Sequence, residues 1–243
     1  MPGTLYLVST PIGNLEDLTF RAVQILRDVQ FIAAENPQVT RELLDHYAIE
    51  TSVTTYHQHN KEEKTPLILN RLQDGHHVAL VCDAGTPVIV DPGAFLVSKA
   101  LAAGISVSPV PGASAVMAAL SVSGLPCDQF VLLGLFPQQT SARRTLAAAL
   151  ADETRTAVLF ISVKHLGTAL DLLRPVLGKR KVVAASNLTT MNETLFRGRV
   201  PELLQMFSKG PLEGEVTVII EGKKRTLPKR RNPGEVNRRG VSE

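Results

Sequence analysis

The sequence predicts an α/β protein built as two lobes. Runs rich in Val, Leu and Ile alternate with helical patterns along the whole chain, which is typical of strands alternating with helices. Several runs are apolar throughout, as expected for strands of a mostly parallel sheet covered by helices on both faces. A cluster of glycines and prolines between residues 124 and 137 separates the runs into two groups, and such clusters mark breaks between structural units.

Each half of the chain contributes four of these runs. The first helix is predicted over residues 14–29, because Leu18, Ala22 and Leu26 recur at helical spacing and form one apolar face together with Ile25 and Val29. Asn14 or Asp17 would cap its start. The predicted strands lie at residues 4–8, 31–34, 76–81 and 105–110, then at 130–133, 156–161, 181–185 and 215–220.

We therefore expect a first lobe over residues 1–123 and a second lobe over 124–222. Residues 223–243 form a basic tail with eight Lys or Arg and two acidic residues, whereas the rest of the chain has 18 basic and 21 acidic residues. A charged, proline-containing segment cannot bury an apolar face, so the tail is expected to be flexible. It would either contact nucleic-acid phosphates or serve only as a solvated terminus.

Composition narrows the class of protein further. With 44% hydrophobic and 20% charged residues the chain can bury a sizeable core. Only two cysteines occur, and no basic leader precedes an apolar segment, which favours a cytoplasmic location over secretion. The longest weakly polar stretch is interrupted by serines and is too short to span a bilayer, so no membrane partner is expected.

Chemistry is expected in the loops that follow the strands, because ligands of α/β proteins bind at the carboxyl ends of the strands. The segment "STPIGNLEDLT" follows the first strand, and "LVCDAGTPVIVDPG" follows the strand at 76–81. The second loop can present backbone groups and the Thr86 hydroxyl to an amino-acid ligand, while Asp83 orients the loop or faces a cation. Alternatively, this loop is a rigid turn in which Asp91 caps the next helix.

A third loop follows the strand at 105–110 and reads "PGASAVMAALSVSGLP". Pro111 and Gly112 end the strand, and Ser114 begins a helix of small residues. Small side chains allow the backbone to approach a flat ring or a neighbouring helix. The sequence leaves both interpretations open.

These segments, in this order, resemble the ribosomal RNA small-subunit methyltransferase I family. The resemblance is carried by "TPIGNLEDLT", "YHQHN", "LVCDAGTPVIVDPG", "PVPGASA", "SGLP" and "GLFPQQTSARR". It implies the tetrapyrrole-methylase (class III S-adenosylmethionine methyltransferase) fold, with a mostly parallel sheet in the first lobe and a mixed sheet in the second. It also implies S-adenosylmethionine as the methyl donor, 2′-O-methylation of a ribose in 16S ribosomal RNA, and a homodimer.

The same resemblance implies which residues contact the donor in a cleft between the lobes, largely through backbone groups. The first-lobe positions are Ile12, Gly85, Thr86, Pro87, Ile89, Pro111 and Gly112, and the second-lobe positions are Phe160, Ile161, Ala185 and Val216.

Transfer to a ribose oxygen requires a positioned hydroxyl and a group that takes its proton. Glu35 and Asp83 are the preferred candidates for this catalytic role, ahead of Asp91 and Lys164. The substrate-binding residues are expected to be Arg143, Arg144 and Lys164, which would hold the RNA backbone. No metal is required.

The chain departs from the family pattern mainly on the acceptor side. The family's Ala-Glu-Asp-Thr-Arg appears as "AENPQ" at residues 34–38, and its Phe-Tyr-Glu-Ser-Pro-His-Arg appears as "FISVKHL" at 160–166. Residues 186–190 and 213–215 also differ from it. These losses bear on substrate and catalysis more than on the fold.

Four alternatives compete with this assignment. A nicotinamide-dependent oxidoreductase is disfavoured because no Gly-x-Gly-x-x-Gly occurs. His57 and His59 alternate in "YHQHN" and are expected to share one face of a strand, but a zinc site formed by them with His76, His77 and Cys82 lacks a second complete ligand pair. A methyltransferase of the same fold acting on a tetrapyrrole-like small molecule stays open. So does a non-catalytic paralogue that binds the donor or RNA.

Overall fold

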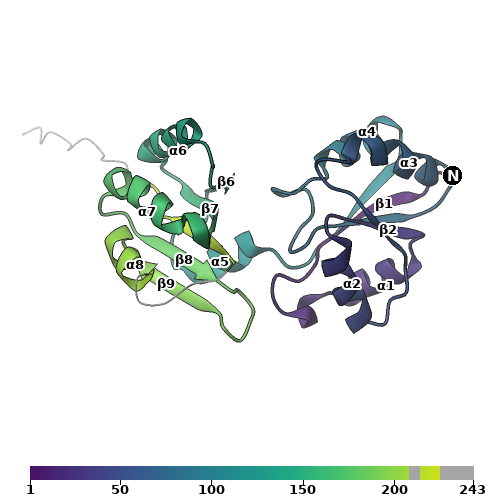
Figure 1. Ribbon diagram of the computed structural model, residues 1–243, viewed down its shortest axis with the longest axis horizontal. Helices are drawn as coiled ribbons and strands as arrows, with labels where there is room; N and C mark the ends of the chain where they lie inside the picture. The colour runs from purple at the N-terminus through teal and green to yellow at the C-terminus, as the bar shows by residue number, and fades with distance from the viewer. Residues whose placement is uncertain (208–213, 225–243) are drawn as a thin grey trace, which may run out of the picture.

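The computed structural model describes residues 1–207 and 214–224, which form two lobes with one five-stranded sheet each (Figure 1). The first sheet has the order β3-β2-β4-β1-β5, and all of its strand pairs are parallel. Its elements are β1 (Thr4–Val8), the 3-10 helix η1 (Leu15–Asp17), α1 (Phe20–Asp28), β2 (Phe31–Ala34), α2 (Pro37–His46), β3 (Val53–Thr55), α3 (Lys61–Gln73), β4 (Val78–Val81), α4 (Ala94–Ala102) and β5 (Ser106–Val110).

Helices cover both faces of this sheet, α1 and α2 on one side and α3 and α4 on the other (Figure 1). Successive strand residues point to opposite faces, so Ile32 packs with Leu26 and Leu44 of the first pair of helices. Its neighbour Ala33 packs with Leu72 on the opposite face. This is why the central strands β2 and β4 are apolar throughout instead of alternating.

The second sheet is mixed. Its order is β6-β7-β10-β8-β9, with β6 parallel to β7 and the remaining pairs antiparallel. The predicted α/β class, with a parallel first sheet and a mixed second sheet, is therefore confirmed. Its elements are α5 (Ala115–Ser123), β6 (Phe130–Leu135), α6 (Thr140–Asp152), β7 (Thr156–Ser162), α7 (Val163–Leu177), β8 (Val182–Ser186), β9 (Thr194–Gly198), α8 (Val200–Phe207) and β10 (Glu215–Ile220).

Helix α5 packs on the second sheet although it precedes the boundary predicted at residue 124. Its buried Val116, Ala119 and Leu120 join one core cluster with Val183 and Ile219 of β8 and β10. The chain thus passes from the first sheet to the second through residues 111–114. The division into lobes at residue 124 stays a prediction.

Local structure corrects part of the predicted first helix. The chain forms η1, turns at Leu18 and only then begins α1, whose cap is the Thr19 hydroxyl accepting from the Ala22 N–H. Asn14 caps η1 instead, and Asp17 caps neither. The predicted apolar face is correct, since Leu18, Ala22, Leu26 and Val29 are all buried.

Two short strands, β3 and β9, were not predicted. Both lie at sheet edges, where few residues are fully buried and the hydrophobic signal is weak. The expectation that His57 and His59 share one face of a strand is wrong. β3 ends at Thr55, and the His57 N–H donates to Asn60 Oδ1 (2.8 Å) in a turn.

The predicted tail falls almost wholly outside the described residues. Where it begins, the Lys223 N–H donates to the Glu153 carbonyl (2.7 Å), and Lys223 Nζ lies 2.6 Å from Asp152 Oδ1. Within the ranges that the structure describes, no helix is long and apolar enough to cross a membrane.

Candidate functional site

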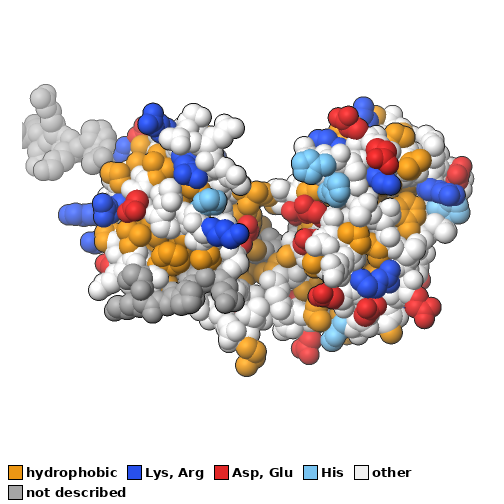
Figure 2. All heavy atoms as spheres, in the orientation of Figure 1, with side chains coloured by type: hydrophobic (Ala, Val, Ile, Leu, Met, Phe, Trp, Pro, Cys, Tyr) orange, Lys and Arg blue, Asp and Glu red, His pale blue; other side chains and the backbone are white. Residues whose placement is uncertain are grey.

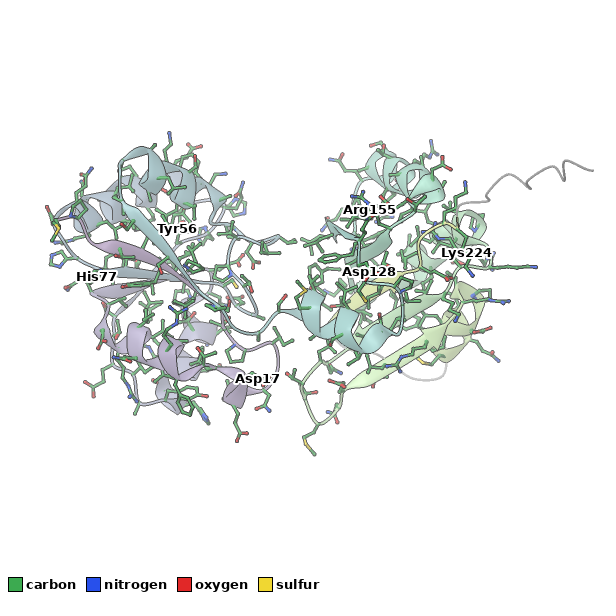
Figure 3. The ribbon with its side chains drawn as sticks, turned by 180° about the vertical axis from the view of Figure 1, so that it is seen from behind. Asp17, Tyr56, His77, Asp128, Arg155 and Lys224 are labelled. Carbon is green, nitrogen blue, oxygen red and sulfur yellow. The ribbon has the colours of Figure 1, made fainter. Side chains whose placement is uncertain are left out.

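The ligand-binding ends of the two sheets face each other. His77 immediately precedes β4 and lies at the end of the first lobe remote from the second (Figure 3), so the carboxyl ends of the parallel strands point toward the second lobe. Lys224 follows β10 and lies at the remote end of the second lobe. The start of β10 and the carboxyl ends of its antiparallel neighbours β7 and β8 therefore point back toward the first lobe.

The loops after β1, β4 and β5 are tied to one another. The backbones of Thr10 and Gly85 exchange two hydrogen bonds of 2.9 and 3.0 Å. The Ser9 hydroxyl donates to Thr86 Oγ1 (3.2 Å), and the Thr86 hydroxyl donates to the Ala113 carbonyl (3.3 Å). The hydroxyl of Thr86 therefore holds the three loops together, a role in addition to the donor contact that the resemblance implies.

Two valines in the loop after β4 have a strained backbone. Val88 and Val90 have φ of 78° and 72°, a region that β-branched residues rarely adopt. Such strain costs on the order of 1–3 kcal/mol per residue and is found mostly at functional sites. Between them, Ile89 is 49% exposed at the gap between the lobes.

A cavity of about 460 Å³ lies between the loops of the first lobe and the strand ends of the second. Register places Thr217 of β10 between Phe160 of β7 and Ala185 of β8, so the three form one row across the sheet. Four predicted donor residues line this cavity, namely Ile12, Ile89, Phe160 and Ala185. The further lining residues are Ala84, Val90, Asp91, Ala115, Leu135, Asn187, Leu188, Thr190, Glu215 and Thr217.

Sequence reasoning missed several of these lining residues. Thr217 carried a signal, since it is a polar residue within the apolar run "EVTVII". Asn187, Leu188 and Thr190 lie on the β8–β9 loop, whose departure from the family pattern gave no indication that it meets the first lobe.

A second cavity of about 490 Å³ lies on the other side of Ile89, which lines both. It is lined by four further first-lobe residues of the predicted set, which are Thr86, Pro87, Pro111 and Gly112. The predicted donor residues therefore line two cavities, and the Ile89 segment lies between them. Gly85 forms the backbone pair beneath that segment, with φ of 86°.

Ile161 and Val216 are placed differently from the other predicted donor residues. Both are fully buried and pack in the core cluster on the opposite face of the second sheet, with Leu166 and Leu170 of α7. Side chains alternate along a strand, so these two face away from the cavity that their neighbours Phe160 and Thr217 line. Direct donor contact by Ile161 and Val216 stays a prediction.

The candidate catalytic carboxylates lie side by side on neighbouring strand ends. Glu35 follows β2, Asp83 follows β4, and the Asn36 N–H donates to Asp83 Oδ1 (3.1 Å). Burial, and then repulsion from Asp91 and Asp83, raises the pKa of Glu35. Burial also raises the pKa of Asp83, while the Asn36 hydrogen bond opposes that rise.

Two further carboxylates reach the same region. Burial raises the pKa of Asp91, and repulsion from Asp83 adds to the rise. Burial and repulsion from Asp91 raise the pKa of Glu215 at the start of β10. The idea that Asp91 caps the next helix is wrong, because the cap position of α4 is Gly93 and has no side-chain hydrogen bond.

The mouth of the cavity is therefore anionic. Acidic side chains gather on the face of the first lobe beside the gap (Figure 2). An environment of this kind favours a cationic ligand and raises the affinity of each carboxylate for a proton. It can hold a positively charged donor and accept a proton from a neutral hydroxyl.

The candidate substrate-binding residues lie on the second lobe. Arg143 on α6 donates from Nε to the Pro137 carbonyl (2.8 Å), and its guanidinium lies 5.1 Å from the centre of the Phe136 ring. Arg144 on α6 and Lys164 at the start of α7 are exposed. Arg143 thus has a local packing role, whereas Arg144 and Lys164 are available to a ligand.

The histidines considered as metal ligands show no such arrangement. The rings of His57 and His59 are 6.0 Å apart. Within residues 1–207 and 214–224, no three His, Cys, Asp or Glu side chains form a cluster that could hold a metal ion.

Comparison with known proteins identifies relatives that match most of the chain. Residues 4–204 match the model of the tetrapyrrole (corrin/porphyrin) methylases. Ribosomal RNA small subunit methyltransferase I of Halalkalibacterium halodurans is 41% identical over 220 residues, which cover 90% of this chain and 76% of that protein. The protein of the same name from Thermotoga maritima is 40% identical over 221 residues, which cover 91% of this chain and 99% of that protein.

Solved structures share the fold at lower sequence identity. A diphthine synthase superposes with a TM-score of 0.68 at 16% identity, covering 90% of each chain. The cobalt precorrin-4 methyltransferase CbiF superposes with a TM-score of 0.67 at 16% identity, covering 90% of this chain and 94% of that one.

Matches over most of the chain, together with the paired sheets and the cavity between their strand ends, determine the family. The chain belongs to the tetrapyrrole (corrin/porphyrin) methylases and, among them, to the ribosomal RNA small subunit methyltransferase I family.

Proposed function

We propose that this protein transfers a methyl group from S-adenosylmethionine to the 2′-hydroxyl of a ribose in 16S ribosomal RNA. The observation that carries the proposal is the cavity between the lobes, where Ile12, Ile89, Phe160 and Ala185 converge from four separate segments. The names of the relatives support ribosomal RNA of the small subunit as the substrate.

The residues around the cavity suit this donor. A volume of about 460 Å³ falls within the roughly 300–1,000 Å³ typical of small-molecule sites. Ile12, Phe160 and Leu188 offer apolar surface to a flat ring, while Asp91 and Glu215 offer negative charge to a cation. When bound, S-adenosylmethionine supplies a methyl group on a positively charged sulfur, which is already activated for transfer.

Glu35 is the proposed proton acceptor. Its pKa is raised by burial and by Asp91 and Asp83, which brings a carboxylate closer to the range useful for general-base catalysis near neutral pH. Asp83 holds the Asn36 backbone (3.1 Å) and thereby positions the loop that carries Glu35. The hydroxyl oxygen would bond to the methyl carbon as the methyl–sulfur bond breaks with its electron pair left on the sulfur, and the hydroxyl proton would pass to Glu35.

Arg144 and Lys164, with Arg143 beside them, are proposed to hold RNA phosphates on the second lobe. The protein is proposed to act as a homodimer in the cytoplasm. The apolar side chains of Met117, Phe130 and Leu132 around the second cavity would suit a surface covered by a second copy. Sedimentation velocity measures that state directly.

The first experiment is calorimetric titration of the full chain with S-adenosylmethionine. The same preparation is then given labelled donor and small ribosomal subunits lacking the family's modification. We expect saturable donor binding and label in RNA ribose. Transfer only to tetrapyrrole-like molecules would replace the proposed substrate, donor binding without any transfer would indicate a non-catalytic paralogue, and absence of donor binding would refute the proposal.

A further inference from the structure

The two lobes are joined by a single covalent crossing. All strands of the first sheet precede residue 111, and every described element from α5 onward packs with the second sheet. One crossing segment acts as a hinge unless other contacts fix the angle between the units. The width of the cavity between the lobes must therefore be determined by non-covalent contacts across the gap.

One such contact is made by Gly13, in the loop between β1 and η1. A Cβ at this position would lie 2.4 Å from the Leu188 carbonyl oxygen, 2.7 Å from Thr190 Cγ2 and 3.0 Å from Thr189 Oγ1. These three residues belong to the β8–β9 loop of the second lobe, which approaches the β1 loop in Figure 1. The φ of Gly13 is not in the left-handed region, so the demand for glycine is steric.

The opposing loop is braced and cannot easily move aside. The Thr190 hydroxyl donates to the Asn187 carbonyl (2.8 Å), and the Thr189 N–H donates to Glu193 Oε2 (2.9 Å). The Leu188 side chain is anchored in the core beneath α5. The nearest atom to the Gly13 position is a backbone oxygen, which no rotamer change can remove.

The residues beside this contact line the cavity from both lobes: Ile12 from the first, and Leu188 and Thr190 from the second. We propose that Gly13 is a positioning residue that sets how closely the lobes approach and thereby the width of the donor cavity. The proposal rests on the proposed function for its effect on the donor. The contact itself does not depend on that function.

The test is a graded series, Gly13→Ala and Gly13→Val, in the full-length chain. Each added carbon should separate the walls of the cavity, and a misplacement of about 1 Å can cost on the order of 100-fold in a positioned reaction. We expect the Kd for S-adenosylmethionine to rise about tenfold or more in Gly13→Ala and further in Gly13→Val, with the melting temperature nearly unchanged. Hydrogen exchange without donor should accelerate across residues 187–193.

Gly222→Ala is the matched control. Its Cβ would lie 2.0 Å from the Thr154 carbonyl oxygen, a comparable clash that is confined to the second lobe and remote from the cavity. It should lower the melting temperature and leave the donor Kd unchanged. Gly167→Ala, which meets nothing within 4 Å, should alter neither.

Donor affinity and hydrogen exchange together distinguish failure of the positioning role from failure of the proposed function. Wild-type donor affinity in both Gly13 variants would overturn the positioning role, whether or not exchange changes. Unaltered exchange in residues 187–193 would also overturn it. If the wild-type chain binds no donor, the proposed function fails, and exchange in the ligand-free protein still decides whether Gly13 fixes the approach of the lobes.

Discussion

Four carboxylates on three segments of the chain have raised pKa values, and two of them, Asp91 and Glu215, line the cavity. A raised pKa means that ionisation of each of these groups destabilises the folded protein. Burial is the largest cause for Glu35, Asp83, Asp91 and Glu215 alike. Groups of this kind are retained where function needs them, at the expense of stability. The backbone strain of Val88 and Val90, which have positive φ in the loop after β4, also lowers the stability of the folded protein at this site.

The Glu35→Gln variant should still bind the donor but should transfer the methyl group much more slowly. The amide has nearly the same shape but cannot accept the hydroxyl proton, so we expect the transfer rate to fall about 10²–10⁴-fold, with the donor Kd within a few-fold of wild type. The wild-type rate should rise with pH through a midpoint above the ordinary carboxyl value of 4.5.

The exposed variant Glu42→Gln on α2 controls for loss of one negative charge. A Glu35→Gln protein with wild-type rates would assign proton removal to another group, and the corresponding measurement on Asp83→Asn would identify it.

Asp91→Asn should stabilise the protein at neutral pH. A carboxyl with a raised folded-state pKa binds its proton more tightly in the folded chain, so its ionised form opposes folding. That penalty is absent below the ordinary pKa of 3.8, appears as pH rises to the raised value, and persists above it. We expect the melting temperature to rise by roughly 1–3 °C at neutral pH, with the gain vanishing in acid.

Asp152→Asn is the control, because this carboxylate is exposed and Lys223 lowers its pKa instead of raising it. It should give no stabilisation at neutral pH. Equal melting curves for Asp91→Asn and wild type at neutral pH would contradict the proposed burial of this carboxylate.

At the scale of elements, strand alternation gives the second sheet one face packed under α7 and another face shared by α5 and the cavity. Phe160, Thr217 and Ala185 form a row on the cavity face. Ile161 and Val216, one residue away along the same strands, are core residues beneath α7. A strand that ends at the cavity therefore places only every second side chain in the cavity wall. Substitutions on the two faces of the sheet should have different effects on donor affinity.

Ala185→Leu and Ala184→Leu test this division. The first replaces a methyl with an isobutyl group at a buried position that lines the cavity and also packs beneath α5. It should weaken donor binding about 10–100-fold, the equivalent of an overpacking cost of about 1–3 kcal/mol, and should also lower the melting temperature. The second overpacks the core on the opposite face and should lower the melting temperature while the donor Kd is retained. The same response from both variants would contradict the assignment of faces.

For the whole molecule, a ligand held between two lobes should couple their unfolding. Donor at 100 times its Kd stabilises the folded chain by about 2.7 kcal/mol, which corresponds to a rise of roughly 5–10 °C in the melting temperature of a chain of this size. Calorimetry should show a single transition that moves as a unit with donor. A shift confined to one of two transitions would mean that the ligand contacts only one lobe.

The sequence alone determined the class of fold and the ligand-bearing loops. Eight of the strands lie where apolar runs predicted them. The signal is strongest in strands such as β4, β8 and β10, which are buried on both faces and are apolar at nearly every position. Loops rich in glycine and proline at strand ends likewise followed from local rules. The short edge strands β3 and β9 did not, because none of their residues is fully buried and their sequences, VTT and TLFRG, contain few consecutive apolar residues.

Only the tertiary structure decided which distant residues meet. Asp91 and Glu215 lie far apart in the chain, and the contact between Gly13 and Leu188 joins loops of different lobes. Nothing in the local sequence around either pair indicates its partner. Periodicity records whether a side chain is buried, whereas the width and charge of the cavity depend on the register of the strands and on how the two sheets approach each other.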